Sequence, residues 1–200
     1  MSFYKRQFRP KRIAVDLDEV IVPMLTPMSI FANKKISRAK NYNYSELLDI
    51  SPDASKQLVH NYYESGMFMS QEPLDNCKEI LTEIKNQGHD IHIVTGRQNY
   101  AKDKTFEWLD KKLPNIIDDV HFTNSFSLDD KPYIPKEDIC NDIKADYMLD
   151  DIPSTLYDIK SNSSTIPLLF GNYSWNNNNK LFKRIRTWNY FMIDCFNKLI

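Results

Sequence analysis

The sequence predicts an α/β fold in which helices flank a five-stranded parallel sheet, with a small helical segment inserted after the first strand. Short apolar runs of the kind found in buried strands alternate with stretches of helical spacing, as in consecutive βαβ units. Two of the runs end in paired acidic residues, which suits the carboxyl end of a parallel sheet, where such folds bind ligands. The five strand-like runs cover residues 13–15, 91–94, 120–122, 147–149 and 166–170.

Helices are expected between these strands. Residues 74–87 carry apolar side chains at helical spacing, with a proline before them and Gly88 where a C-terminal cap belongs. Residues 99–113 form a second amphipathic stretch, and residues 135–143 form a shorter one. We expect the basic segment 180–186 to be the solvated face of a helix, with a nucleic-acid patch as the alternative.

Residues 24–68 break the alternation, because their pattern is helical throughout and is interrupted only by prolines. We expect a helical cap that folds over the edge of the sheet as a lid. The predicted domains are an α/β core of residues 1–22 and 72–200 and a cap of residues 23–71. Most aromatic residues of the cap are expected to pack in its own core, and one or two to face a substrate: Phe31, Tyr42, Tyr44, Tyr62, Tyr63 and Phe68.

Composition and charge narrow the class of protein. The chain has 200 residues, a formal net charge of −1, 42% hydrophobic residues and 26% charged residues, which is ordinary for a globular protein. This balance provides no overall attraction to nucleic acid or to membranes. No apolar run is long enough to span a bilayer, and the basic N-terminal stretch lacks the apolar segment of a signal peptide. We therefore expect a cytoplasmic protein without a membrane partner.

Cysteine and histidine usage agrees with this expectation. Cys77, Cys140 and Cys195 are far apart and form no CxxC pair, so we expect reduced thiols in the core. None of the four histidines has metal-ligand spacing to another, and we expect no zinc site. The sequence is silent on oligomeric state, so a homodimer is an open alternative.

Four loops at the predicted carboxyl ends of strands carry residues that suit phosphoryl transfer. A carboxylate can act as a nucleophile, and a second acid two residues later as general acid and base. A hydroxyl and backbone N–H groups can hold phosphate oxygens. A lysine offsets negative charge, and carboxylates bind Mg²⁺ together with water and phosphate. The residues are Asp16, Asp18, Thr95, Gly96, Lys136, Asp150 and Asp151.

This ordered set resembles the haloacid dehalogenase superfamily of phosphatases, four of whose motifs follow one another over most of the chain. The resemblance implies a Rossmann-like core, with Asp16 as the nucleophile and Asp18 as the general acid and base. It also implies a Mg²⁺ ion held by Asp16, Asp150 and the backbone carbonyl of Asp18. Asp151 would contact the ion through a water molecule or would contact the residues that bind the ion directly.

The same resemblance identifies the phosphate-binding residues as Thr95, Gly96, Arg97 and Lys136. Lys131 and Lys144 also precede the acidic pair, but Lys136 is preferred for the catalytic role because it starts a helix, as the family's motif requires. For Arg97 two alternatives are open, namely a contact with phosphate and a solvated position at the start of a helix.

The resemblance narrows in the second half of the chain to the C-type 5′(3′)-deoxyribonucleotidase branch. It rests on Asp-Asp-Ile-Pro at 150–153, Leu-Leu-Phe at 168–170, Tyr-Ser-Trp-Asn at 173–176 and Arg-Ile-Arg-Thr-Trp at 184–188. Glu19 stands where this branch usually has glycine, which implies a bulkier or more acidic floor of the site. Asp151 is also expected to cap the helix that begins near Pro153.

The resemblance therefore implies a Mg²⁺-dependent phosphatase that hydrolyses phosphate monoesters through an aspartyl-phosphate intermediate. Its expected substrate is a small phosphorylated molecule, and the expected activity is that of a 5′-nucleotidase on nucleoside or deoxynucleoside monophosphates. One alternative keeps the chemistry and changes the ester to a sugar phosphate or the 3′-phosphate end of a nucleic acid. Another is a non-catalytic binding protein on the same fold.

Overall fold

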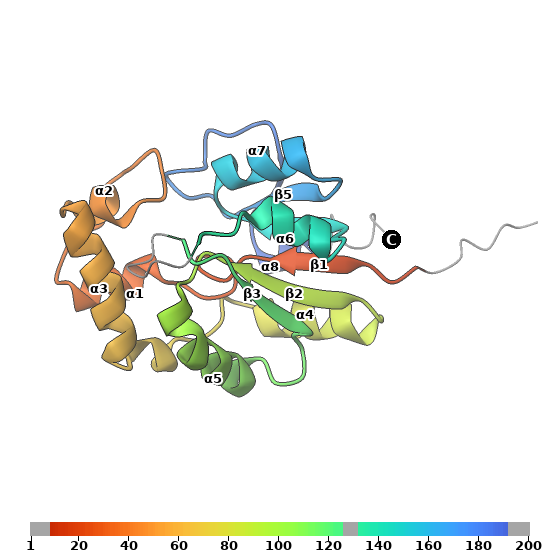
Figure 1. Cartoon of the computed structure of the whole chain (residues 1–200), viewed down its shortest axis with the longest axis horizontal. Coiled ribbons are helices and arrows are strands. Elements are labelled where there is room, and N and C mark those ends of the chain that lie inside the picture. Colours follow the sequence, from red (N-terminus) through yellow and green to blue (C-terminus); the bar gives the residue numbers. More distant parts are fainter. Residues whose placement is uncertain (1–8, 126–131, 192–200) are drawn as a thin grey trace, which may run out of the picture.

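The computed structural model describes residues 9–125 and 132–191 (Figure 1). At its centre is a six-stranded parallel sheet of order β3-β2-β1-β4-β5-β6. The predicted α/β fold with a helix-flanked parallel sheet is confirmed, but the predicted number of strands was one too few. The strands are β1 (Arg12–Val15), β2 (Asp90–Thr95), β3 (Asp119–Phe122), β4 (Tyr147–Asp150), β5 (Ile166–Phe170) and β6 (Lys183–Ile185).

The strand missing from the prediction is β6, which lies in the segment expected to be helical. It pairs with β5, with Ile185 opposite Phe170, and forms one edge of the sheet. Ile185 is fully buried, whereas Lys183 and Arg184 are the kind of charged residues that protect an edge strand from further pairing. The helical interpretation of this segment was wrong. A strand of three residues, two of them basic, is too short to show the alternation of polar and apolar residues by which a strand is recognised.

The strand order reverses beside β1. The chain passes from β1 to β2 and β3 on one side, and β4, β5 and β6 then extend the sheet on the other. In the β1–β4 pair Val15 lies opposite Leu149, so the first and fourth strands are neighbours in the sheet. A reversal of this kind leaves a crevice at the carboxyl ends of the strands, where α/β proteins bind ligands.

Helices cover both faces of the sheet. Apolar residues of β1 alternate between the two layers, as a pleated strand requires: Ile13 and Val15 pack on one side, Ala14 on the other. The first layer contains α4 (Cys77–Asn86), α5 (Lys102–Lys112) and α8 (Trp188–Tyr190), and the second contains α6 (Lys136–Asp142) and α7 (Pro153–Asn162).

The predicted helices are present with shifted ends. α4 begins three residues later than expected, because Asn76 before it adopts a left-handed φ of 61°. The predicted helix 99–113 is divided into a 3₁₀ turn, η2 (Asn99–Ala101), and α5. Among the described residues, no helix has the length and apolar character needed to cross a membrane. Cys77 and Cys140 are buried free thiols, and Cys195 lies outside the described residues.

Between β1 and α4 the chain forms α1 (Leu25–Phe31), α2 (Tyr44–Leu48), α3 (Pro52–Glu64) and the 3₁₀ helix η1 (Met67–Ser70). Figure 1 shows α1, α2 and α3 grouped beyond the carboxyl ends of the strands. The segment is not helical throughout, since residues 32–43 hold no helix between α1 and α2. Side chains of Asn43 and Ser51 accept backbone N–H groups at the starts of α2 and α3, which explains where these helices begin.

The aromatic residues of this segment are not confined to a core of their own. Tyr62, Tyr63 and Phe68 are fully buried in the same apolar cluster as β1 and α5. The ring of Phe68 lies 5.4 Å from that of Tyr63 and 5.5 Å from that of Trp108 in α5. These three residues are core residues as expected, but their core is continuous with the sheet layer rather than confined to the cap.

Candidate active site

Three charged side chains meet at the carboxyl ends of β1 and β4 and the start of α6. The Lys136 Nζ donates to Asp16 Oδ1 at 2.7 Å and to Asp150 Oδ2 at 2.8 Å. All three residues are buried, and the Asp16 backbone N–H donates to the Leu149 carbonyl at 2.9 Å. The structure thus brings together the residues that the sequence proposed as nucleophile, catalytic lysine and metal ligand.

Burial dominates the electrostatics of this cluster. It raises the pKa of Asp16 to about 7, with the Asp150 and Asp18 carboxylates adding to the rise and Lys136 opposing it. Burial alone would lower the pKa of Lys136, but the carboxylates of Asp150 and Asp16 outweigh it and raise that pKa. Lys136 is therefore a permanent cation that stabilises Asp16 as a carboxylate in a poorly hydrated position.

The rival lysine that the structure describes, Lys144, does not share this position. Lys144 comes just before β4, at the end of the strand opposite to Asp150. Lys131 lies outside the described residues. The preference for Lys136 therefore agrees with its contacts, while its catalytic role stays a prediction.

Asp151 adds a third carboxylate. One ligand atom from each of Asp16, Asp150 and Asp151 lies within 4.8 Å of the others. Asp151 Oδ2 accepts from Trp175 Nε1 at 2.8 Å, but its Oδ1 is buried without a hydrogen-bond partner. Burial raises the pKa of Asp151 well above its usual range, and Asp150 and Asp16 add to the rise. An unpaired buried carboxylate oxygen is costly, so this cluster fits a hard cation such as Mg²⁺, which prefers oxygen ligands.

Asp151 does not cap α7, and that expectation was wrong. The backbone N–H of Ile152 donates to Asp150 Oδ1 at 2.8 Å, and Ile152 itself occupies the capping position. Pro153 does lie in the first turn, where its missing N–H costs nothing. The two carboxylates therefore have different partners: Asp150 accepts the Ile152 backbone N–H, and Asp151 accepts the Trp175 indole N–H.

Two residues after β5 hold this acidic loop in place through hydrogen bonds. Asn176 Nδ2 donates to the carbonyls of Asp151 and Phe170, both at 2.9 Å. Arg184 Nη1 donates to Asn176 Oδ1 at 2.9 Å, and its Nη2 donates to the Asn176 carbonyl at 2.7 Å. The sequence pointed to these positions only through the resemblance in the tail, and gave no indication that they hold the loop in place.

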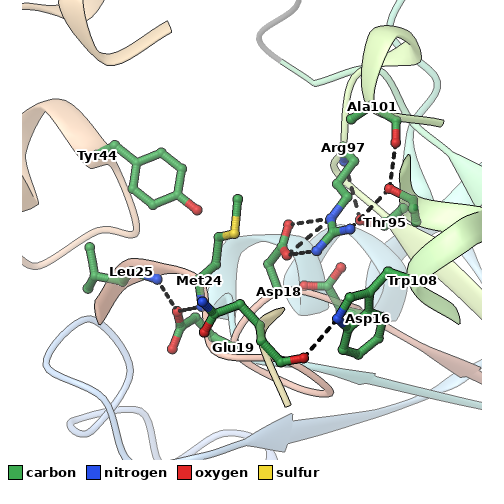
Figure 2. Close-up of polar contacts among 12 residues, drawn as sticks. Asp16, Asp18, Glu19, Met24, Leu25, Tyr44, Thr95, Arg97, Ala101 and Trp108 are labelled. Carbon is green, nitrogen blue, oxygen red and sulfur yellow. Dashed lines mark hydrogen bonds and ion pairs between the residues drawn. The ribbon is translucent and has the colours of Figure 1, made fainter. Parts of the chain in front are cut away.

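Asp18 is paired with Arg97, as Figure 2 shows. Arg97 Nη2 lies 2.6 Å from Asp18 Oδ1, and its Nε lies 3.2 Å from both carboxylate oxygens. The guanidinium lies 4.2 Å from the centre of the Phe68 ring, and its Nη1 donates to Thr105 Oγ1 at 3.0 Å. Arg97 is only 2% exposed, so the alternative of a solvated side chain at a helix start is wrong. Thr105 and Phe68 are partners that no motif revealed.

Thr95 and Gly96 lie at the end of β2, the strand next to β1. Thr95 is fully buried and its Oγ1 accepts the Arg97 backbone N–H at 3.3 Å, while the Gly96 carbonyl accepts the Ser125 N–H at 3.1 Å. Within the described part of the chain, no hydrogen bond links either residue to Asp16. Their role in binding phosphate stays a prediction.

Glu19 occupies a backbone conformation that suits glycine, the residue that the resemblance implies at this position. Glu19 adopts a φ of 63°, the left-handed region in which glycine is favoured. Its Oε1 accepts the backbone N–H groups of Met24 at 2.8 Å and Leu25 at 2.6 Å (Figure 2). Burial raises the pKa of Glu19, and these two bonds oppose the rise. The carboxylate accepts two N–H groups at the start of α1, and its charge also contributes to the raised pKa of Asp151, so the more acidic floor stays a prediction.

Two tyrosines of the inserted segment approach the site. The Tyr42 and Tyr44 hydroxyls lie 2.7 Å apart, and the Tyr42 ring lies 4.9 Å from the Trp175 ring. In Figure 2 the Tyr44 hydroxyl points towards the side on which Asp18 lies. Both tyrosines also pack against the apolar cluster of Leu25, Leu47, Leu48 and Trp175, so a contact with substrate stays a prediction for them.

The family model for "5' nucleotidase, deoxy (Pyrimidine), cytosolic type C protein" matches residues 9–197. The chain belongs to this family. This member of the 5′-nucleotidase family is 25% identical over 159 residues to a protein of Oceanobacillus iheyensis named "Putative nucleotidase OB0422", with 80% of each chain covered. It is 24% identical over 184 residues to a protein of Staphylococcus aureus (strain Mu50) named "Putative 5'(3')-deoxyribonucleotidase", which covers 89% of this chain and 91% of the relative.

The fold is similar to that of a haloacid dehalogenase-like hydrolase, SP0104 of Streptococcus pneumoniae. The TM-score is 0.58 at 11% identity, and the match covers 88% of this chain and 94% of the other. This likeness shows the fold alone. Together with the family match, it confirms the resemblance drawn from the motifs, and the chain is a phosphatase of the haloacid dehalogenase type that hydrolyses phosphoric monoesters.

Proposed function

We propose that this protein is a Mg²⁺-dependent 5′-nucleotidase that hydrolyses nucleoside or deoxynucleoside monophosphates through a phosphorylated Asp16. The observation that carries the proposal is the buried cluster of Asp16, Lys136 and Asp150 at the reversal point of a nucleotidase-family fold. A carboxylate held by a lysine and surrounded by further carboxylates is suited to accept a phosphoryl group while a cation balances the charge.

In the first step an Asp16 carboxylate oxygen forms a bond to phosphorus, the ester P–O bond breaks, and the leaving oxygen takes a proton from Asp18. In the second step Asp18 accepts a proton from water, the water oxygen bonds to phosphorus, and Asp16 leaves as a carboxylate with inorganic phosphate as the product. In the structure Arg97 Nη2 lies 2.6 Å from Asp18 Oδ1 and holds the Asp18 carboxyl group in place. Thr95 and Gly96 are proposed to hold phosphate oxygens at the end of β2.

The residues proposed to hold Mg²⁺ are Asp16, Asp150 and the backbone carbonyl of Asp18, with Asp151 acting through water. Support comes from the donor set, which is all oxygen, and from the buried Asp151 Oδ1 that has no hydrogen-bond partner. When bound, the ion offsets the negative charge of phosphate and carboxylates in the transition state. Lys136 supplies the complementary charge from the protein itself.

We further propose that residues 23–71 act as a cap over an α/β core of residues 1–22 and 72–200. Tyr42 and Tyr44, whose hydroxyls lie 2.7 Å apart, would contact the base or sugar of the nucleotide. A cap that closes over the substrate excludes bulk water and selects the leaving group. The buried free thiols Cys77 and Cys140 support a reducing, cytoplasmic location.

Phosphate release from a panel of substrates tests this proposal. The panel contains 5′- and 3′-nucleoside and deoxynucleoside monophosphates, sugar phosphates and a 3′-phosphorylated oligonucleotide, each with and without Mg²⁺, and Asp16→Asn serves as the inactive control. We expect Mg²⁺-dependent release from 5′-monophosphates to be fastest. Turnover of sugar phosphates or of the oligonucleotide without any nucleotide turnover would reject the nucleotidase proposal and favour the corresponding alternative ester.

A further inference from the structure

A second group of metal-ligating side chains lies on the β3 edge of the sheet. His92 comes from β2, and Asp119 and His121 come from β3. The register places Asp119 opposite His92 and His121 opposite Val94, so all three side chains project from the same face. His121 Nε2 lies 3.3 Å from His92 Nδ1 and 3.5 Å from Asp119 Oδ2. One ligand atom from each residue lies within 4.8 Å of the others.

We propose that His92, Asp119 and His121 form a binding site for a transition-metal dication of the Zn²⁺ class, separate from the acidic cluster at Asp16. A tetrahedral ion with bonds of about 2.0–2.1 Å holds its donor atoms roughly 3.3–3.4 Å apart. The two measured separations are close to this value. Three protein ligands would leave one position for water or an external ligand.

The ligand types define the class of ion. Imidazole nitrogen suits zinc, nickel, cobalt and copper, whereas Mg²⁺ prefers sites made only of oxygen. Asp119 Oδ1 accepts the Val120 backbone N–H at 2.8 Å, which orients the carboxylate and leaves Oδ2 facing His121. Burial lowers the pKa of His92, and His121 adds to the effect, which favours the neutral form that binds metal.

The surroundings permit an ion to reach the site. The side chains of His121 and Asp119 are 23% and 62% exposed, so the site is open to solvent. Arg12 near His92 opposes a cation, whereas Asp119 and Asp118 favour one. The two imidazole rings are nearly parallel, at 18° and 5.6 Å between centres. Because the last torsion of a histidine side chain is soft, both nitrogens can turn towards one ion without movement of the backbone.

The sequence did not reveal this group, and we expected no zinc site. The two histidines are 29 residues apart and are joined only by the pairing of two parallel strands. The alternative without a metal ion is a histidine pair that shares a proton in a hydrogen bond. That alternative and the metal site differ in one measurable property, which is stoichiometric binding of an imidazole-seeking ion.

The test is calorimetric titration of untagged, EDTA-treated full-length protein with Zn²⁺, with excess Mg²⁺ present to occupy the acidic cluster. Cobalt replaces zinc in a parallel titration followed by visible absorption. We expect one Zn²⁺ per chain. His92→Ala and His121→Ala should each weaken binding at least about tenfold, because even outer partners of metal ligands cost 10–100-fold when removed.

His60→Ala is the matched control, since His60 also packs on an aromatic ring, that of Tyr100 at 5.0 Å, and should bind Zn²⁺ like the wild type. Asp119→Asn, on an exposed side chain, serves as the milder variant if a histidine variant fails to fold, and should also weaken binding. Absence of stoichiometric Zn²⁺ binding to the wild type, or equal binding by all variants, would overturn the proposal. Because the readout is metal binding rather than turnover, the result is independent of the proposed nucleotidase activity.

Discussion

Glu19 combines a strained backbone with two buried hydrogen bonds, and substitutions can separate the two effects. A left-handed φ costs a residue other than glycine roughly 1–2 kcal/mol. A hydrogen bond to a charged group contributes about 1.5–3 kcal/mol, so the bonds from Met24 and Leu25 together contribute at least about 3 kcal/mol. Glu19→Gly loses the bonds and relieves the strain, and should therefore destabilise the fold by about 1–2 kcal/mol. Glu19→Ala loses the bonds and keeps the strain, so it should be about 1–2 kcal/mol less stable than Glu19→Gly.

Urea unfolding of the wild type and both variants, at a pH where the Glu19 carboxyl is ionised, measures these differences by linear extrapolation. An unchanged m-value would show that the folded states are comparably compact. If Glu19→Ala matched or exceeded Glu19→Gly in stability, the backbone at this position would not be strained. If Glu19→Gly were more stable than the wild type, the two bonds would contribute less than the strained backbone costs.

Three further predictions concern the proposed active site. Lys136→Ala should reduce kcat far more than Lys144→Ala, because Lys136, unlike Lys144, contacts Asp16 and Asp150; equal losses in steady-state assays would contradict this assignment. Asp18→Asn should lower kcat by about 10²–10⁴-fold, the range for a general acid–base group, and a near-normal rate would exclude that role. Burial raises the pKa of Asp16 from 3.8 to about 7. The contribution of Asp16 to the stability of the metal-free fold is therefore fully present below pH 3.8, where the carboxyl is protonated, and is lost as the pH rises through about 7. The increase in melting temperature caused by Mg²⁺ should therefore grow as the pH passes upward through about 7, and a Mg²⁺ effect independent of pH would argue against Asp16 as a ligand.

The fold was largely predictable because its main signals are local. Buried parallel strands appear as apolar runs, and their alternation with helices indicates a parallel sheet. β6 escaped notice because three residues with two charges show neither apolar continuity nor alternation. The left-handed turn at Asn76 and the non-helical residues 32–43 were also missed, although asparagine is one of the residues that tolerate a positive φ.

The candidate site was predictable in part. Asp16, Lys136 and Asp150 were proposed together because the carboxyl ends of neighbouring parallel strands must meet. The partners that orient them could not be inferred, because each depends on a contact between distant segments. Arg97 reaches Asp18 across 79 residues, and Trp175 reaches Asp151 from beyond β5. The pair His92 and His121 was missed for the same reason, since strand register is not written in residue spacing.

The most direct test of the proposed mechanism is to find the phosphoryl group on the protein. Full-length protein is mixed with Mg²⁺ and a deoxynucleoside 5′-monophosphate, quenched in acid within one turnover, and its peptides are analysed by mass spectrometry, with Asp16→Asn as the control. The mechanism predicts one phosphoryl group on Asp16 in the wild type and none in the variant. Turnover with a phosphoryl group on a different residue, or continued turnover by Asp16→Asn, would contradict it.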